Sequence, residues 1–261
     1  MWNPLFIIIF ADINKQERIM GLDIYAGTLT RYYSGNWKLI TQQIAEQEGW
    51  SFSVITSEGE YTPVSNLEEI EEIRTLIQEW QAFLLNSIPD EYKETLWEEN
   101  MEKGYFTDKP GWEAWIALSI FQYATLLNKP FPKTVCGDTM IECPLFKEGE
   151  EKDIKSTLMN VQLWLPFEHS YKFSFIDPRY KEATMATVSY LEKELIDLNN
   201  ATWKADERTI LSWRNDEYYN PIKENKTPIY HTESLAKCAY SILYKAVKFA
   251  KENNVPIVWD F

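Results

Sequence analysis

Glycine is scarce in this chain, and that scarcity limits the kinds of site that it contains. Nine glycines stand among its 261 residues. None of them has the spacing of a P-loop or of the dinucleotide-binding fingerprint, and no Gly-x-Ser-x-Gly elbow occurs. We therefore expect neither of these two kinds of nucleotide site, nor a hydrolase site built on that elbow. No cofactor is predicted.

Histidine and cysteine are scarcer still. The three cysteines, Cys136, Cys143 and Cys238, cannot all pair and do not have zinc-finger spacing. We expect reduced thiols, a cytoplasmic location and no metal site. The two histidines, His169 and His231, limit imidazole catalysis to two positions. A nucleophilic pair of His231 and Cys238 is less expected than a core position for Cys238.

Positive charge is also in short supply. The chain carries 40 acidic and 26 basic side chains, which gives a formal net charge of −14. An acidic surface repels phosphate groups, so neither nucleic acid nor an anionic membrane is an expected partner. A basic protein is. The apolar run at 5–11 is too short to span a bilayer and has no Lys or Arg before it, unlike a signal peptide.

The first residues are predicted to be a translated leader. The permitted codons of residues 15–19 resemble a bacterial ribosome-binding site, and they lie just upstream of the Met20 codon. We therefore interpret 1–19 as a non-native leader, and 20–261 as a single domain that starts at Met20. An N-terminus at Met1 in the native protein, measured by mass spectrometry, would contradict this.

Hydrophobic periodicity predicts an α+β fold with a mixed sheet. An N-terminal β-α-β unit is expected over 21–29, 37–47 and 50–56. The other predicted helices are an acidic one that starts after Asn66, a buried central one over 113–128, one over 190–199 and a long C-terminal one over 233–253. The other predicted strands cover 160–165, 171–176, 183–188 and 255–259. A proline-containing irregular stretch makes 129–160 the expected lobe boundary.

Two clusters contain the candidate site residues. In the first, a strand carries Asp23 and Tyr25 on one face, and a polar, aromatic strand end follows with Arg31, Tyr32 and Tyr33. The structural alternative is a buried Asp23 that pairs with Arg31 or accepts hydrogen bonds from backbone groups.

The second cluster surrounds the start of the central helix. Asp108 is expected to cap that helix, while Trp112, Trp115 and Trp164 either line a pocket or present an aromatic contact surface. His169, in a polar turn beside Glu168, is a further candidate, although a histidine in such a turn is usually just solvated.

The opening MGLDIYAGTLTRYY at 20–33 resembles the start of an uncharacterised bacterial protein family. The segments FTDKP at 106–110 and LWLP at 163–166 look similar to later family segments. The resemblance implies a bacterial cytoplasmic setting and carries no known activity.

Two functions remain open from the sequence. The first is a noncatalytic binding protein, for example an acidic immunity-type neutraliser of a basic partner such as a toxin domain. The second is a small hydrolase-like enzyme in which Asp23, Tyr25 and Asp108 act on a small polar substrate. Charge and aromatic content favour the first.

Overall fold

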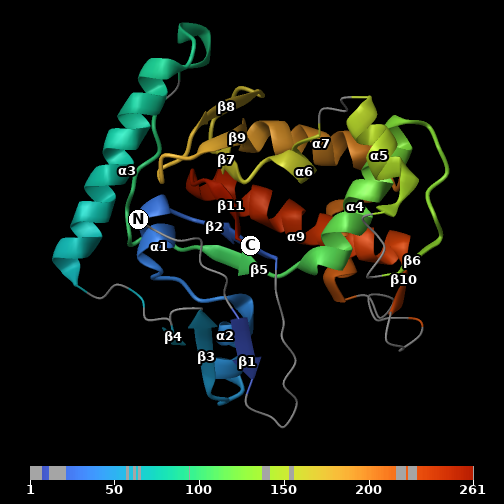
Figure 1. Ribbon diagram of the computed structural model, residues 1–261, viewed down its shortest axis with the longest axis horizontal. Coiled ribbons are helices and arrows are strands. Elements are labelled where there is room, and N and C mark those ends of the chain that lie inside the picture. Colours follow the sequence, from blue (N-terminus) through green and yellow to red (C-terminus); the bar gives the residue numbers. More distant parts are fainter. Residues whose placement is uncertain are drawn as a thin grey trace.

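The computed structural model describes residues 8–11, 22–56, 59–60, 63, 66–93, 95–136, 142–152, 156–215, 222 and 228–260. In these residues the strands form a six-stranded sheet, a three-stranded sheet and a two-stranded ribbon, and helices flank the largest sheet (Figure 1). The predicted α+β class with a mixed sheet is confirmed.

The six-stranded sheet joins segments from both ends of the chain. Its order is β5 (Phe106–Asp108), β2 (Asp23–Ala26), β11 (Ile257–Asp260), β7 (Leu163–Leu165), β9 (Glu182–Thr187) and β8 (Lys172–Ile176). β7 and β9 are parallel, whereas the other neighbours are antiparallel. The strands predicted over 171–176 and 183–188 form the antiparallel β8–β9 hairpin. Strand β11 lies in the interior of the sheet, between β2 and β7.

One face of this sheet is covered by three helices: α4 (Gly111–Leu126), α7 (Val188–Ala201) and α9 (Thr232–Asn253). Alternation along the strands turns Ile24, Trp164 and Trp259 toward them, and all three side chains are buried. Helix α4 is apolar on every side because it packs within this core. The predicted buried central helix and long C-terminal helix are confirmed, and His231 is the N-cap of α9.

The opposite face is covered by α1 (Leu29–Ser34) and α3 (Leu67–Ser87), which runs along the outer flank (Figure 1). As predicted, Asn66 caps α3, because its side chain accepts a hydrogen bond from Glu68 N. Trp80 fixes the helix to the sheet by donating its indole N–H to the carbonyl of Ile176 at 2.7 Å. We call this side the α1 face and the other the α4 face.

The strand-helix-strand order at the N-terminus is present, but its two strands lie in different sheets. After β2 come α1, α2 (Ile40–Gln47) and β3 (Phe52–Thr56), and β3 pairs with β1 (Ile8–Ala11) and β4 (Gly59–Glu60). A period-two pattern predicts a strand without naming its partner. Residues 8–11 of the predicted leader thus form a strand, and a start at Met20 stays a prediction.

The stretch expected to be an irregular connection contains regular elements. They are β6 (Thr134–Cys136), which pairs with β10 (Ile229–His231), α5 (Pro144–Glu151) and α6 (Thr157–Asn160). Helix α5 packs on α4: a Cβ at Gly149 would lie 2.8 Å from the Tyr123 ring. A lobe boundary at 129–160 stays a prediction. The remaining elements are α8 (Glu207–Ser212) and the 3-10 helices η1 (Asp90–Tyr92) and η3 (Trp213–Asn215).

Candidate functional site

The sheet places the two predicted aspartates on opposite faces. Ile24 of β2 is paired with Asp108 of β5, so their side chains share the α4 face. Asp23 precedes Ile24 and therefore points to the α1 face, as Tyr25 does. The two clusters predicted from the sequence are thus separate sites.

Three charged residues form a row on the α1 face. Asp23 is paired with Asp260 across β2 and β11. Because Ile24 is paired with Asp108, the next residue of that segment, Lys109, lies beside Asp23 on the other side. We call Lys109, Asp23 and Asp260 the strand-end row.

Asp260 connects the row to α1 and to the β8–β9 turn. Tyr32 donates its hydroxyl to Asp260 Oδ1 at 2.6 Å. Burial raises the pKa of the Asp260 carboxyl, and this hydrogen bond and the Arg179 charge oppose the rise. Arg179 in turn forms an ion pair of 3.0 Å with Asp177. Tyr33 also lies near this pair, since both charges influence its hydroxyl.

Asp23 and Lys109 each have a buried polar atom without a hydrogen bond to another described group. Asp23 is 4% exposed, and in the described part of the chain its Oδ1 has no hydrogen-bond partner. The Lys109 Nζ is also buried without a hydrogen bond. Burial raises the pKa of Asp23 to about 7, against the attraction of Lys109 and together with repulsion from Asp260 and Asp108.

Tyr25 belongs to the scaffold of this face. It is fully buried and donates its hydroxyl to the Thr28 carbonyl at 2.9 Å. Its ring contacts those of Tyr32, Trp37 and Tyr105. Burial holds the pKa of its hydroxyl far above the ordinary value.

The sequence-based ion pair between Asp23 and Arg31 is wrong. Arg31 donates to the carbonyl oxygens of Asn36 at 3.1 Å, of Lys103 at 3.2 Å and of Met101, and it lies over the Tyr105 ring. It therefore fixes α1 to the segment before β5. A strand and a helix that follow each other in sequence do not reveal this contact.

Asp108 is not the cap of α4, contrary to the prediction. Pro110 is the N-cap, and Asp108 forms a bidentate ion pair with Arg214 of η3, with N–O distances of 3.0 to 3.2 Å. Arg214 lies 106 residues further along the chain, so no local pattern predicts this pair. The same guanidinium lies beside Cys238, whose pKa burial raises to about 11.

The tryptophans form part of the core. Trp164 has no exposed surface, and Trp259 joins it to Trp115 through edge-on contacts of 6.0 and 6.4 Å between ring centroids. Trp115 donates to the Leu158 carbonyl, while Trp112 is half-buried beside it. These contacts give Trp115 and Trp164 a packing role.

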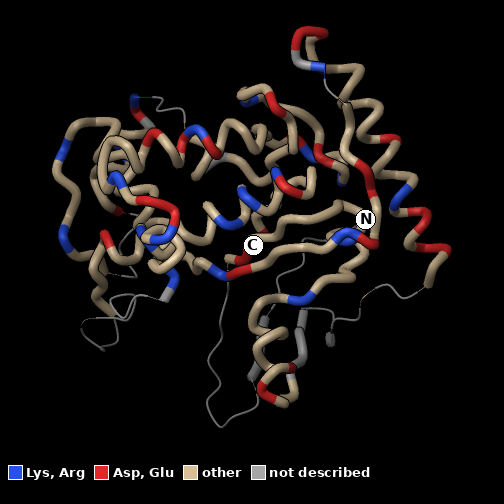
Figure 2. The backbone as a smooth tube through the Cα atoms, turned by 180° about the vertical axis from the view of Figure 1, so that it is seen from behind, with Lys and Arg blue, Asp and Glu red and all other residues tan. Residues whose placement is uncertain are grey.

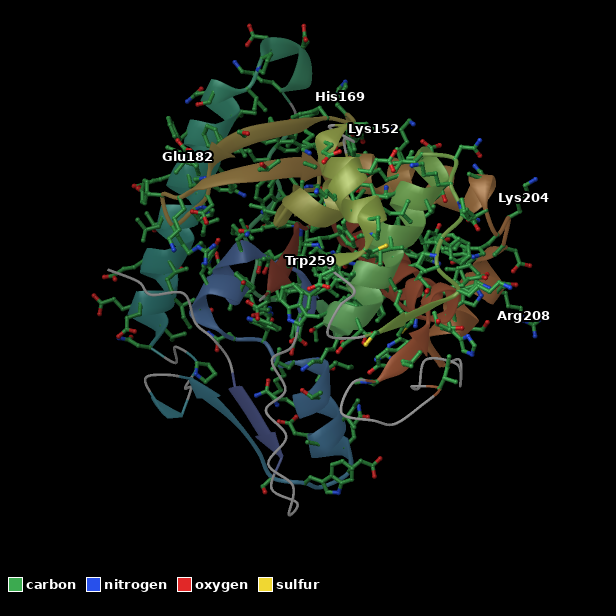
Figure 3. The ribbon with its side chains drawn as sticks, turned by 45° about the vertical axis from the view of Figure 1, so that its right-hand side comes forward. Lys152, His169, Glu182, Lys204, Arg208 and Trp259 are labelled. Atoms are coloured by element: carbon green, nitrogen blue, oxygen red, sulfur yellow. The ribbon has the colours of Figure 1, made fainter. Side chains whose placement is uncertain are left out.

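His169 lies apart from the strand-end row. It is exposed in the turn between β7 and β8, whereas Arg179 is in the turn at the other end of β8. Figure 3 shows His169 at the outside of the molecule, well apart from Trp259, the neighbour of Asp260.

A second candidate site is the outer side of α3. At 100° per residue, Leu76 and Phe83 point the same way, roughly a quarter turn from buried Ile77 and Leu84. The Phe83 ring also packs against Phe175 of β8, with 5.2 Å between the ring centroids. Leu76 and Phe83 are 55% and 51% exposed. Three glutamates share this direction. We call the set the α3 outer face: Glu69, Glu72, Leu76, Glu79 and Phe83.

Leu76 and Phe83 fall at helical spacing with the buried residues Ile77, Trp80 and Leu84 of α3. Their spacing fits a helix, but the apolar residues cover more than one side of it, and only the side turned to the sheet is buried. The helix holds five glutamates and one arginine, and Figure 2 shows acidic residues along its length at the edge of the molecule.

Comparison of the chain with protein-family models, curated proteins and solved structures found no match. The resemblance to an uncharacterised bacterial family therefore stays a prediction. None of the described helices is long and apolar enough to cross a membrane. The described residues contain no group of three or more His, Cys, Asp or Glu side chains suited to a metal ion.

Proposed function

We propose that this protein is a noncatalytic binding protein whose α3 outer face holds a basic protein partner. The observation that carries the proposal is the exposure of Leu76 and Phe83 on a helix rich in glutamate. Exposed apolar side chains ringed by charge are typical of protein contact surfaces.

Charge determines the chemistry of the partner. Glu69, Glu72 and Glu79 flank the two apolar side chains, and the whole chain is strongly acidic. A cationic segment with apolar side chains at helical spacing matches this surface, because its lysines or arginines meet the glutamates. Nucleic acid and anionic membranes do not match it.

The enzyme hypothesis has less support. Of its three side chains, Tyr25 is fully buried and bonded to a backbone carbonyl, and Asp108 is bound by Arg214. Only Asp23 keeps an oxygen without a partner. One carboxylate without a nucleophile or a second proton-transfer group is a weak basis for hydrolysis.

The proposal extends to an immunity-type role in the cytoplasm. A basic toxin domain is a partner of the required charge, and binding without chemistry is sufficient to neutralise it. The three thiols are free, and Cys238 is buried, as expected for a reducing compartment.

The test uses a designed helical peptide in which leucine and lysine alternate at amphipathic spacing, labelled for fluorescence anisotropy. We expect saturable binding that weakens as salt is added. A peptide with glutamate in place of lysine should not bind. Absence of binding by the lysine peptide contradicts the proposal.

A matched pair of variants locates the surface. Leu76→Ser should weaken binding about fivefold or more, since it removes an apolar contact at the centre of the face. Leu126→Ser is the control, because Leu126 is 57% exposed on α4. The double variant Glu72→Gln, Glu79→Gln should reduce the salt dependence of peptide binding. An equal loss of peptide affinity in Leu76→Ser and Leu126→Ser would show that the peptide does not bind to the α3 outer face.

A further inference from the structure

The strand-end row has an unusual polar composition that the proposed protein-binding role does not use. Asp23 Oδ1 and Lys109 Nζ are both buried, and neither has a hydrogen bond to another described group. Buried polar atoms in folded proteins nearly always have partners, because an unbonded charge away from water is costly. Asp23 and Lys109 are the two oppositely charged side chains of one row in which such atoms occur, and they leave hydrogen bonds that a bound molecule can supply.

The two atoms do not satisfy each other. Asp23 and Lys109 attract each other, since the ammonium lowers the pKa that burial raises. Yet no ion pair or hydrogen bond joins them, although each of the two atoms lacks any other partner. A group that bridges them must donate a hydrogen bond to the carboxylate and accept one from the ammonium.

Charge in the row limits the class of that group. The neighbouring carboxylates Asp23 and Asp260 repel an anion, and Lys109 repels a cation. A neutral hydroxyl both donates and accepts, so it matches the hydrogen bonds that Asp23 Oδ1 and Lys109 Nζ lack.

The rest of the row extends the site toward the surface. Asp260 and Lys109 are half-buried, and the Arg179 side chain, which acts on Asp260, is 41% exposed. An acceptor at Asp260 and a donor at Arg179 are suited to further hydroxyls of the same molecule. Tyr32, bonded to Asp260 Oδ1, holds that carboxylate in place.

We propose that the strand-end row binds a small neutral polyhydroxy compound, such as a monosaccharide, with one hydroxyl between Asp23 and Lys109 and its neighbours at Asp260 and Arg179. This small-molecule site is independent of the α3 outer face.

The probes are D-glucose, D-ribose and glycerol, each titrated into the full chain at millimolar concentrations and followed by saturation-transfer NMR. We expect saturable binding of at least one of them. Lys109→Met and Asp23→Asn should each weaken it about tenfold or more, because each removes a charged hydrogen-bond partner.

The controls are the same two substitutions in an exposed pair. Asp90 and Lys93 form an ion pair of 2.5 Å on η1, so Asp90→Asn and Lys93→Met test the chemistry of the substitution alone. Both should leave binding unchanged. Equal weakening in the control pair, or no binding of any probe, overturns the proposal.

A crystal structure of the unsubstituted protein soaked in the probe that binds gives a measurement that does not depend on the folding of the variants. Density for a ligand hydroxyl within hydrogen-bond distance of Asp23 Oδ1 and Lys109 Nζ supports the site. A single water there, with the probe bound elsewhere or absent, overturns it.

Discussion

Asp23 and Asp108 are buried aspartates on neighbouring strands, and the two faces of the sheet treat them differently. On the α4 face, Asp108 receives a bidentate ion pair from Arg214. On the α1 face, Asp23 Oδ1 has no hydrogen bond from any group in the described part of the chain. Burial alone therefore does not tell which of the two carboxylates can still accept a hydrogen bond from a ligand. The hydrogen bonds of each carboxylate make that distinction.

The surroundings of the two residues explain the difference. The α4 face packs small and aliphatic side chains of α4 and α9 closely together, with Ala117, Ala239 and Ala246 fully buried. The α1 face carries tyrosines and the strand-end row. Close packing leaves no place for a charge without a partner. On the other face, Asp23 lies between the charged residues Lys109 and Asp260.

The largest effect is expected from removing the charge of Asp23. Its folded pKa of about 7 lies above the ordinary 3.8, so the folded state keeps the proton that the unfolded state loses. Stability contributed by the protonated group is present below pH 4 and is lost as the pH rises to 7. The free energy of unfolding of Asp23→Asn, compared with that of the unsubstituted protein, should therefore rise by roughly 3 to 4 kcal/mol between pH 4 and pH 8.

Urea unfolding of both proteins across this pH range measures the gain, and a carbon-13 titration of the Asp23 carboxyl measures its pKa directly. A difference in stability that is the same at pH 4 and pH 8 would show that Asp23 titrates normally.

A smaller effect is expected on the α4 face. Arg214→Met leaves the Asp108 carboxylate buried without its partner and should cost about 2 kcal/mol of unfolding free energy, less than a fully buried pair because Arg214 is partly exposed. The double variant Asp108→Asn, Arg214→Met should recover most of this loss. Denaturant midpoints of the unsubstituted protein, the two single variants Arg214→Met and Asp108→Asn, and the double variant give the coupling. If the losses of unfolding free energy in the two single variants add up in the double variant, the ion pair does not stabilise the fold.

The smallest effect is expected for Arg31. Arg31→Ala leaves the carbonyls of Met101 and Lys103 without their donor and should cost on the order of 1 kcal/mol. Because Arg31 is not the partner of Asp23, the cost should be equal at pH 5 and pH 8. A cost that appears only at pH 8, measured by thermal unfolding, would restore the ion pair with Asp23.

The elements whose signals are local were predictable from the sequence. Helix α3 follows its Asn66 cap, α4 is a continuous apolar run, and the β8–β9 hairpin surrounds an Asp-Pro turn. Strand partners were not predictable, because pairing depends on contacts between distant segments. For this reason β3 was expected beside β2 and instead lies in another sheet.

The candidate site was predictable in part. Asp23 and Tyr32 follow from alternation and from proximity in sequence. Asp260 and Lys109 were missed, because only the register of β2 with β11 and β5 brings them to Asp23. The α3 outer face was missed because helical spacing identifies apolar sides without showing which side meets the sheet.

The central position of β11 also has a kinetic consequence. Ile257 is paired with Ala26, so two segments from opposite ends of the described chain must meet before the sheet is continuous. Closing so long a loop costs entropy before any contact compensates for it, which slows folding. Local helices and the β8–β9 hairpin can form before this step, because their contacts are close in sequence. The strand-end row forms only when β2 and β11 pair. Until then its carboxylates stay hydrated and ionised at neutral pH.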